Sequence, residues 1–141
     1  MNKLLALALY LVAEAYKDEY DKGGNPMMLH FIYVMNNCGD DLETKIIAVL
    51  HDAAEDGKIT LNYLREMNFP ESICTALDIL WHKEDEDYLN VYIKRIALHT
   101  KCKAVKKADL KHNSDITRLK GVRQKDFERL EKYSKAYLYL S

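Results

Sequence analysis

Four ionisable side chains fall within six consecutive residues, in the segment 51–56 that reads HDAAED. The segment follows the apolar run 46–50, which contains neither glycine nor proline and is therefore expected to be helical. On a helix, the last two residues of the segment lie one turn beyond the first two. Three carboxylates then share the end of a buried helix, where they must raise a pKa or bind a cation. A solvated acidic helix end is the alternative, but a histidine-aspartate pair directly after five apolar residues favours a metal site.

Two other polar side chains stand where a helical pattern predicts apolar ones. His30 shares a face with the apolar residues of the segment 27–38, so it is expected to point toward the core. A helical stripe with an aspartate at its centre is formed by Val105, Asp109, His112 and Ile116. Asn113 adds a polar group one turn beyond Asp109, and a buried carboxylate without a partner would be destabilising or protonated. A lone histidine on an apolar face is usually just packed, whereas a shared metal ion would explain all of these residues together.

The elements that must position these residues are helices, because no stretch of the sequence alternates with a period of two. Helices are expected at 2 to about 20, 26 to about 38, 45–56, 60–67, from 70 onward, 88 to about 99, 100 to about 119, and 125–140. The charged segment 83–87 is expected to be a solvated loop rather than a second metal site. The predicted fold is therefore all-α, with about seven or eight helices packed in layers.

The breaks between these helices carry recognisable end signals. The glycine pair 23–24 stops the first helix, after which Asn25 is the expected N-cap and Pro26 the first residue of the second helix. An aspartate of the pair 40–41 caps the helix that carries the segment 51–56, and Gly57 ends it. These signals predict that the polar residues singled out above come from three different helices.

Composition sets the broad class of the protein. The 141 residues are 48% hydrophobic, enough for one domain spanning 1–141 with its own core. A net charge of −1 gives no general case for binding nucleic acid or membranes. The three cysteines are widely spaced, which is typical of buried thiols in a reducing compartment. The apolar run 4–13 only loosely imitates a secretory signal, so a cytoplasmic protein is expected.

Five lysines surround the aspartate of the last stripe: Lys101, Lys103, Lys106, Lys107 and Lys111. Lysines on a polar helix face are most often just solvated. Those close to a metal site could instead contact a phosphate group of a ligand. The sequence leaves both interpretations open.

Three blocks of sequence resemble the HD-domain phosphohydrolase superfamily: KGGNPMMLH, AVLHDAAEDGKIT and KKADLKHNSD. The combination of an upstream histidine, HDxxED, Gly-x-x-Thr and ADxxxN is most similar to the hydrolase domain of RelA/SpoT-type enzymes and to the single-domain small alarmone hydrolases. The blocks match in order and spacing across residues 16 to about 119. The resemblance implies a compact helical fold and hydrolysis of (p)ppGpp at its 3′-pyrophosphate.

The resemblance also implies roles for individual residues. One divalent ion, typically manganese, would be bound by His30, His51, Asp52 and Asp109. The mixed imidazole and carboxylate donors would suit Fe, Co or Zn as well. The pair Glu55 and Asp56 would position or deprotonate the attacking water, and Lys22 and Asn113 would contact the substrate.

The loop before the first ligand helix departs from the family pattern. Asp21 stands where relatives carry an arginine expected to stack on guanine, and Met27 replaces a tyrosine. The predicted partner is therefore a small phosphorylated molecule, either (p)ppGpp or another nucleotide or phosphorylated cofactor. A non-catalytic nucleotide-binding module on the same scaffold is the third possibility. The sequence gives no indication of the oligomeric state.

Overall fold

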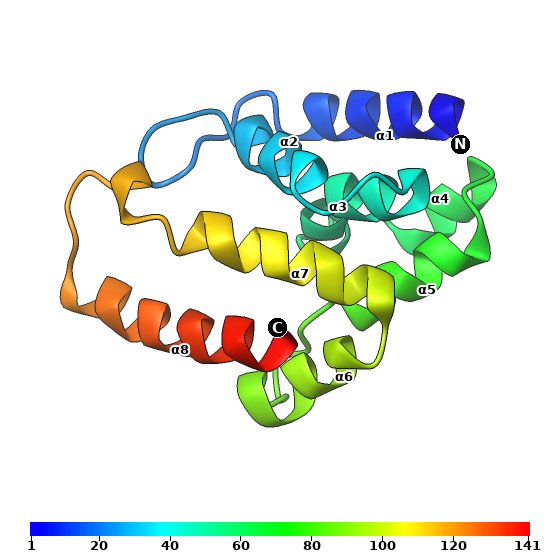
Figure 1. The fold of residues 1–141 in the computed structure, drawn as a ribbon. Coiled ribbons are helices and arrows are strands. Elements are labelled where there is room, and N and C mark those ends of the chain that lie inside the picture. Colours follow the sequence, from blue (N-terminus) through cyan, green and yellow to red (C-terminus); the bar gives the residue numbers. More distant parts are fainter.

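The computed structural model describes residues 1–141 and is built entirely of helices, as predicted (Figure 1). In chain order the eight α-helices are α1 (Asn2–Ala15), α2 (Met28–Asn36), α3 (Leu42–Glu55), α4 (Leu61–Glu66), α5 (Glu71–Ile79), α6 (Lys94–Ala97), α7 (Thr100–Asn113) and α8 (Gln124–Leu140). A π-helical turn, Tyr88–Ile93, precedes α6, and a 3-10 turn, Ile116–Arg118, follows α7. None of the helices is long and apolar enough to span a bilayer.

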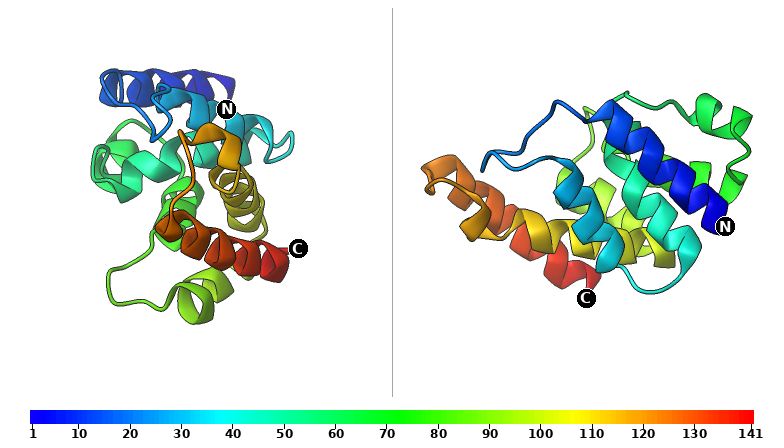
Figure 2. Two further views of the ribbon diagram at one scale, coloured as in Figure 1. Left: turned by 90° about the vertical axis from the view of Figure 1, so that its left-hand side faces the viewer. Right: turned by 90° about the horizontal axis from the view of Figure 1, so that it is seen from above.

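Helix α3 lies at the centre of the molecule, and α1, α2, α5 and α7 pack against it (Figures 1 and 2). The apolar run 46–50 gives the middle of α3 no polar side, so this part of the helix is stable only when other helices surround it. All five residues of that run are fully buried. His51, directly after the run, is buried as well, whereas Glu55 and Asp56 at the helix end are exposed.

Helix α3 has the ends that the sequence predicts. Asp41, rather than Asp40, is the N-cap, and its carboxylate accepts the backbone N–H of Thr44 at 3.0 Å. Gly57 follows the helix with a φ of 75°, a left-handed conformation that glycine adopts without strain. These two end signals fix the register of the segment 51–56.

Two predicted boundaries are wrong. Helix α1 ends at Ala15 rather than near Tyr20, because Tyr16 turns into the core and none of the side chains of residues 17–20 is buried. Asn25 and Pro26 do not start α2. Pro26 instead pairs with Tyr20 in an isolated antiparallel bridge, so residues 17–27 form a closed loop.

The helix predicted at 100–119 is also too long. Helix α7 ends at Asn113, and the Asp115 carboxylate caps the following 3-10 turn by accepting the N–H of Thr117 at 3.0 Å. Ile116 consequently leaves the predicted stripe and is 49% exposed, whereas Val105 and Asp109 are buried as expected. The early end of α7 brings residues 114–120 beside the loop 17–27, as the left-hand side of Figure 1 shows.

Candidate metal centre and adjoining cavity

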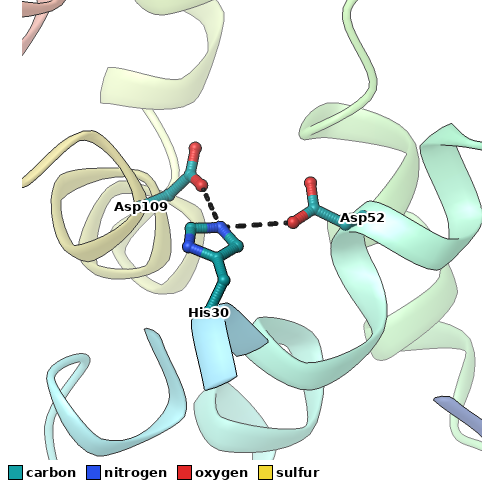
Figure 3. A group of neighbouring side chains, drawn as sticks. All are labelled: His30, Asp52 and Asp109. Atoms are coloured by element: carbon teal, nitrogen blue, oxygen red, sulfur yellow. Dashed lines mark hydrogen bonds and ion pairs between the residues drawn. The ribbon is translucent and has the colours of Figure 1, made fainter. Parts of the chain in front are cut away.

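The four predicted metal ligands come together where α2, α3 and α7 meet. His30 lies in the first turn of α2, His51 and Asp52 lie near the end of α3, and Asp109 lies in the second half of α7. Nε2 of His30 is 2.9 Å from Oδ1 of Asp109 and 3.3 Å from Oδ2 of Asp52 (Figure 3). Ligand atoms of these three residues all lie within 4.8 Å of one another. That spacing is compatible with one ion between them.

The fourth residue, His51, gives the clearest sign that the cluster is built for a cation. Its Nδ1 lies 2.8 Å from the backbone oxygen of Ala48, and therefore carries the proton that it donates there. Its Nε2 is buried without a hydrogen-bond partner, 3.4 Å from Oδ1 of Asp52 and 3.7 Å from Oδ1 of Asp109. Without a cation between them, Nε2 carries a proton at neutral pH, because a nitrogen lone pair aimed at two carboxylates is destabilising. A divalent ion would satisfy it, so the residues present fit a metal ion.

Charge within the cluster is balanced by protons and by a lysine. Burial would raise the pKa of Asp109, but Lys106 and the two histidines hold it well below its usual range. Nζ of Lys106 is 2.9 Å from Oδ2 of Asp109. Burial alone would lower the pKa of this lysine, but the neighbouring carboxylate of Asp109 raises it well above its usual value. Lys106 therefore neutralises one carboxylate oxygen and leaves the other facing the histidines.

The five lysines around Asp109 thus do not act as a group. Lys106 is the one that contacts a predicted ligand, three residues before Asp109 and so on the same helix face. Lys101 instead pairs with Asp41 and Glu43 at the start of α3. None of the five lines the cavity described below, which favours the solvated interpretation for the others.

His112 has a role that the sequence pattern did not reveal. Its ring stacks between those of His30 and Tyr33, with centroid distances of 5.0 and 4.0 Å. Burial, together with nearby Arg118 and His30, lowers the pKa of His112 to about 4, so it is neutral. Its Nδ1 lies 2.7 Å from Nδ1 of His30. If His112 accepts a proton there, His30 presents the lone pair of Nε2 toward the carboxylates, as a metal ligand must.

Replacing His112 by phenylalanine is expected to weaken manganese binding about 10- to 100-fold, because the ring can still stack but no longer orients His30. Calorimetric titration of Mn²⁺ into metal-free protein measures the change. His112→Gln, which keeps an acceptor oxygen, serves as the control and should lose less. Equal affinity in the phenylalanine variant and the wild type would contradict this role for His112.

Proton competition should make metal affinity depend on pH. Burial would lower the pKa of His51, but the carboxylates of Asp52 and Asp109 raise it to about 9. An incoming ion must displace that proton, so affinity for Mn²⁺ should rise about tenfold per pH unit for each proton released, and level off near pH 9. Calorimetry in buffers of different ionisation enthalpy counts the released protons. An affinity that does not change between about pH 7 and that limit would contradict the prediction.

The predicted catalytic pair lies at the same helix end, but its members point to different places. Oδ2 of Asp56 accepts the hydroxyl of Tyr16 at 2.5 Å, and this contact adds to burial in raising the pKa of Tyr16. Oε2 of Glu55 accepts the backbone N–H of His82 at 2.9 Å. Asp56 lines the adjoining cavity and Glu55 does not.

The cavity beside the cluster has a volume of about 420 Å³, within the range of small-molecule sites. Five of the predicted site residues line it: Lys22, His30, Asp52, Asp56 and Asn113. His51 and Asp109 lie behind them as buried residues. The cavity would give a small molecule access to the candidate metal centre.

The two predicted substrate residues differ in how firmly they are held. Nδ2 of Asn113 donates to Oδ1 of Asp109 at 3.0 Å, so Asn113 also positions a candidate metal ligand. Lys22 is exposed and forms no ion pair. Its ammonium group is therefore free to meet an anionic ligand.

Comparison with known proteins identifies the fold. No protein-family description matches the sequence, and no curated protein matches it either. Among solved structures, the chain superposes on one described as a metazoan ortholog of SpoT that hydrolyses ppGpp and plays a role in starvation responses. The TM-score is 0.79 at 18% sequence identity, over 97% of this chain and 84% of that one. The chain therefore has the all-α fold of a SpoT-type hydrolase, as the resemblance of its three sequence blocks implied.

Proposed function

We propose that this protein is a metal-dependent phosphohydrolase of the HD type, a single domain over 1–141, that cleaves a phosphate ester or pyrophosphate of a nucleotide. The observation that carries the proposal is the position of the buried Nε2 of His51. This atom faces the carboxylates of Asp52 and Asp109 beside the cavity and forms no hydrogen bond. Two imidazoles and two carboxylates that converge on one point are also a donor set that divalent transition metals bind. The shared fold with a ppGpp-hydrolysing protein supports the same conclusion.

In this proposal one divalent ion, manganese by expectation, is held by His30, His51, Asp52 and Asp109. Such an ion supplies Lewis acidity, which acidifies water and screens the charge of a phosphate group. The protein's part is to hold the ligands in their metal-binding protonation states. Ala48 and His112 do this for the two histidines, and Lys106 does it for Asp109.

Asp56 is the better placed of the two catalytic candidates. Tyr16 occupies one of its carboxylate oxygens, which leaves the other to take a proton from water in the cavity. Glu55 instead accepts the backbone N–H of His82, and its carboxylate does not line the cavity. Lys22 supplies a positive charge for the substrate's phosphate.

The most specific form of the proposal is removal of the 3′-pyrophosphate of (p)ppGpp. Its main support is the activity stated for the protein that shares the fold. Asp21 favours the second form, a phosphatase for another nucleotide or phosphorylated cofactor, because a carboxylate lines the cavity where an arginine was expected.

A screen of nucleotide phosphates tests the proposal. Purified protein is incubated with ppGpp, 3′-phosphorylated nucleotides and a phosphorylated cofactor, with Mn²⁺ and again after chelation. Release of phosphate or pyrophosphate that requires the ion is the expected result. Absence of turnover with every compound would overturn the enzymatic proposal and favour a nucleotide-binding module.

A further inference from the structure

Asp21 is held in the cavity wall by three hydrogen-bond donors, so its carboxylate is not free to contact a nucleotide base. Its Oδ1 accepts the backbone N–H groups of Gly23 and Asn25, both at 2.9 Å. Its Oδ2 lies 3.2 Å from the guanidinium of Arg118. Burial would raise the pKa of Asp21, but these partners lower it, so the carboxylate is ionised. The residue therefore closes the loop 21–25 and fixes an arginine.

The loop and the 3-10 turn after α7 are fitted to each other at that point. A Cβ atom on Gly23 would lie 2.0 Å from the backbone oxygen of Arg118, so only glycine allows this approach. Arg118 also donates to the backbone oxygen of His112 at 2.9 Å, and its Nη1 lies 3.4 Å from Oδ1 of Asn113. Asn113 in turn contacts Asp109. Arg118 is thus connected to the candidate metal centre through one residue.

Arginines in the cavity wall are neutralised by neighbouring carboxylates. Arg118 pairs with Asp21, and Arg129 lies 3.6 Å from Asp126, a buried residue at the start of α8. Lys22 is the remaining lysine or arginine of the lining, and it has no such partner. The carboxylates of the lining are Asp21, Asp52, Asp56, Asp115 and Asp126.

This charge pattern suits a ligand that carries one phosphate group. A phosphate monoester brings a charge of about −1.5 to −2. One divalent ion and Lys22 can balance that charge. A second phosphate group would have to lie near the carboxylates of the lining, where no unpaired cation remains to balance its charge. Negative charges this close to one another repel.

We propose that the Asp21–Arg118 ion pair determines substrate specificity, by withholding a cation from the cavity and so favouring nucleotides with a single phosphate group over those with several. The proposal rests on the second form of the function proposed above, a phosphatase for another nucleotide, and names its substrate class. Breaking the pair from either side should have opposite effects. Asp21→Asn keeps the oxygen that closes the loop but releases Arg118 toward the ligand. Arg118→Gln removes the cation and leaves Asp21 uncompensated.

The test is equilibrium binding of guanosine 3′-monophosphate, guanosine 3′,5′-bisphosphate and ppGpp to manganese-loaded protein, in an Asp56→Asn background that slows turnover and keeps the four candidate metal ligands. The wild-type pocket should bind the monophosphate more tightly than ppGpp. Asp21→Asn should raise the affinity for ppGpp relative to that for the monophosphate about tenfold. Arg118→Gln should lower this ratio of affinities by a similar factor. Arg118→Lys, which keeps the charge, should stay close to the wild-type ratio.

Asp40→Asn is the matched control, because Asp40 is exposed, lies outside the cavity and forms no ion pair. It should leave the ratio unchanged. Shifts in the same direction for Asp21→Asn and Arg118→Gln would indicate a merely structural pair and overturn the inference. Unchanged ratios alongside intact hydrolysis would overturn the inference alone. Absence of hydrolysis with the predicted order of binding would overturn only the proposed function, and absence of binding by every nucleotide would overturn both.

Discussion

Asp52→Asn is expected to abolish tight binding of the divalent ion and to lower kcat/KM for phosphate release at least about 10³-fold. The amide keeps the shape of the side chain but removes the negative charge between His30 and His51. Asp52 is also the ligand whose side chain is most open to the cavity, at 25% exposed, so the change should be tolerated by the fold. Metal content of the purified variant and initial rates with added Mn²⁺ measure both losses.

Asp40→Asn provides the control for the loss of one carboxylate, and it should retain the ion and the activity. Asp109→Asn is a less informative variant, because it would leave the ammonium group of Lys106 buried without its partner and so destabilise the protein as well. If Asp52→Asn bound Mn²⁺ and hydrolysed substrate like the wild type, the assignment of Asp52 as a ligand would be wrong.

The second large effect is expected at the acidic pair beyond the ligands. Asp56→Asn should lower kcat about 10²- to 10⁴-fold with little change in metal affinity, because it removes the proposed proton acceptor and none of the ligands. Steady-state kinetics at saturating Mn²⁺, together with a metal titration, separate the two properties. Tyr16→Phe should have a smaller effect, since it removes only the hydroxyl that orients Asp56.

Glu55→Gln distinguishes between two roles for the other member of the pair. If Glu55 assists proton transfer, the variant should lose kcat about as strongly as Asp56→Asn. If Glu55 only holds the backbone of His82, the variant should keep most of the activity and instead loosen the segment 82–87, as hydrogen exchange would detect. Full activity in both Asp56→Asn and Glu55→Gln would contradict the proposed chemistry.

The helix that carries the chemistry could be predicted closely because its signals are local. Asp41 at one end and Gly57 at the other act through the backbone of their immediate neighbours. The apolar run between them requires burial wherever the chain goes. The false helix start at Asn25 and Pro26 shows the limit of such signals, since Pro26 is held by a bridge to Tyr20 and by loop closure at Asp21.

The candidate ligands could be named from sequence because His30 and Asp109 stand at helical positions where apolar residues were expected, and because the HD-type blocks imply the full set. The side chains that orient them could not be named. His112 faces His30 from 82 positions along the chain, and Arg118 reaches Asp21 across 97. Lys106 is the exception, because it lies three residues before Asp109 on the same helix, and only its contacts with Tyr88 and Tyr92 of the π-helical turn link separate elements. Contacts of this kind depend on how helices pack, which residue type and spacing alone do not specify.

The most direct test of the proposed metal site is a crystal structure of the protein grown with Mn²⁺, with anomalous scattering data that locate the ion. One strong peak is expected among α2, α3 and α7, with His30, His51, Asp52 and Asp109 each contributing a coordinating atom. A peak located elsewhere, or no peak at saturating Mn²⁺ with Nε2 of His51 still unpartnered, would contradict it.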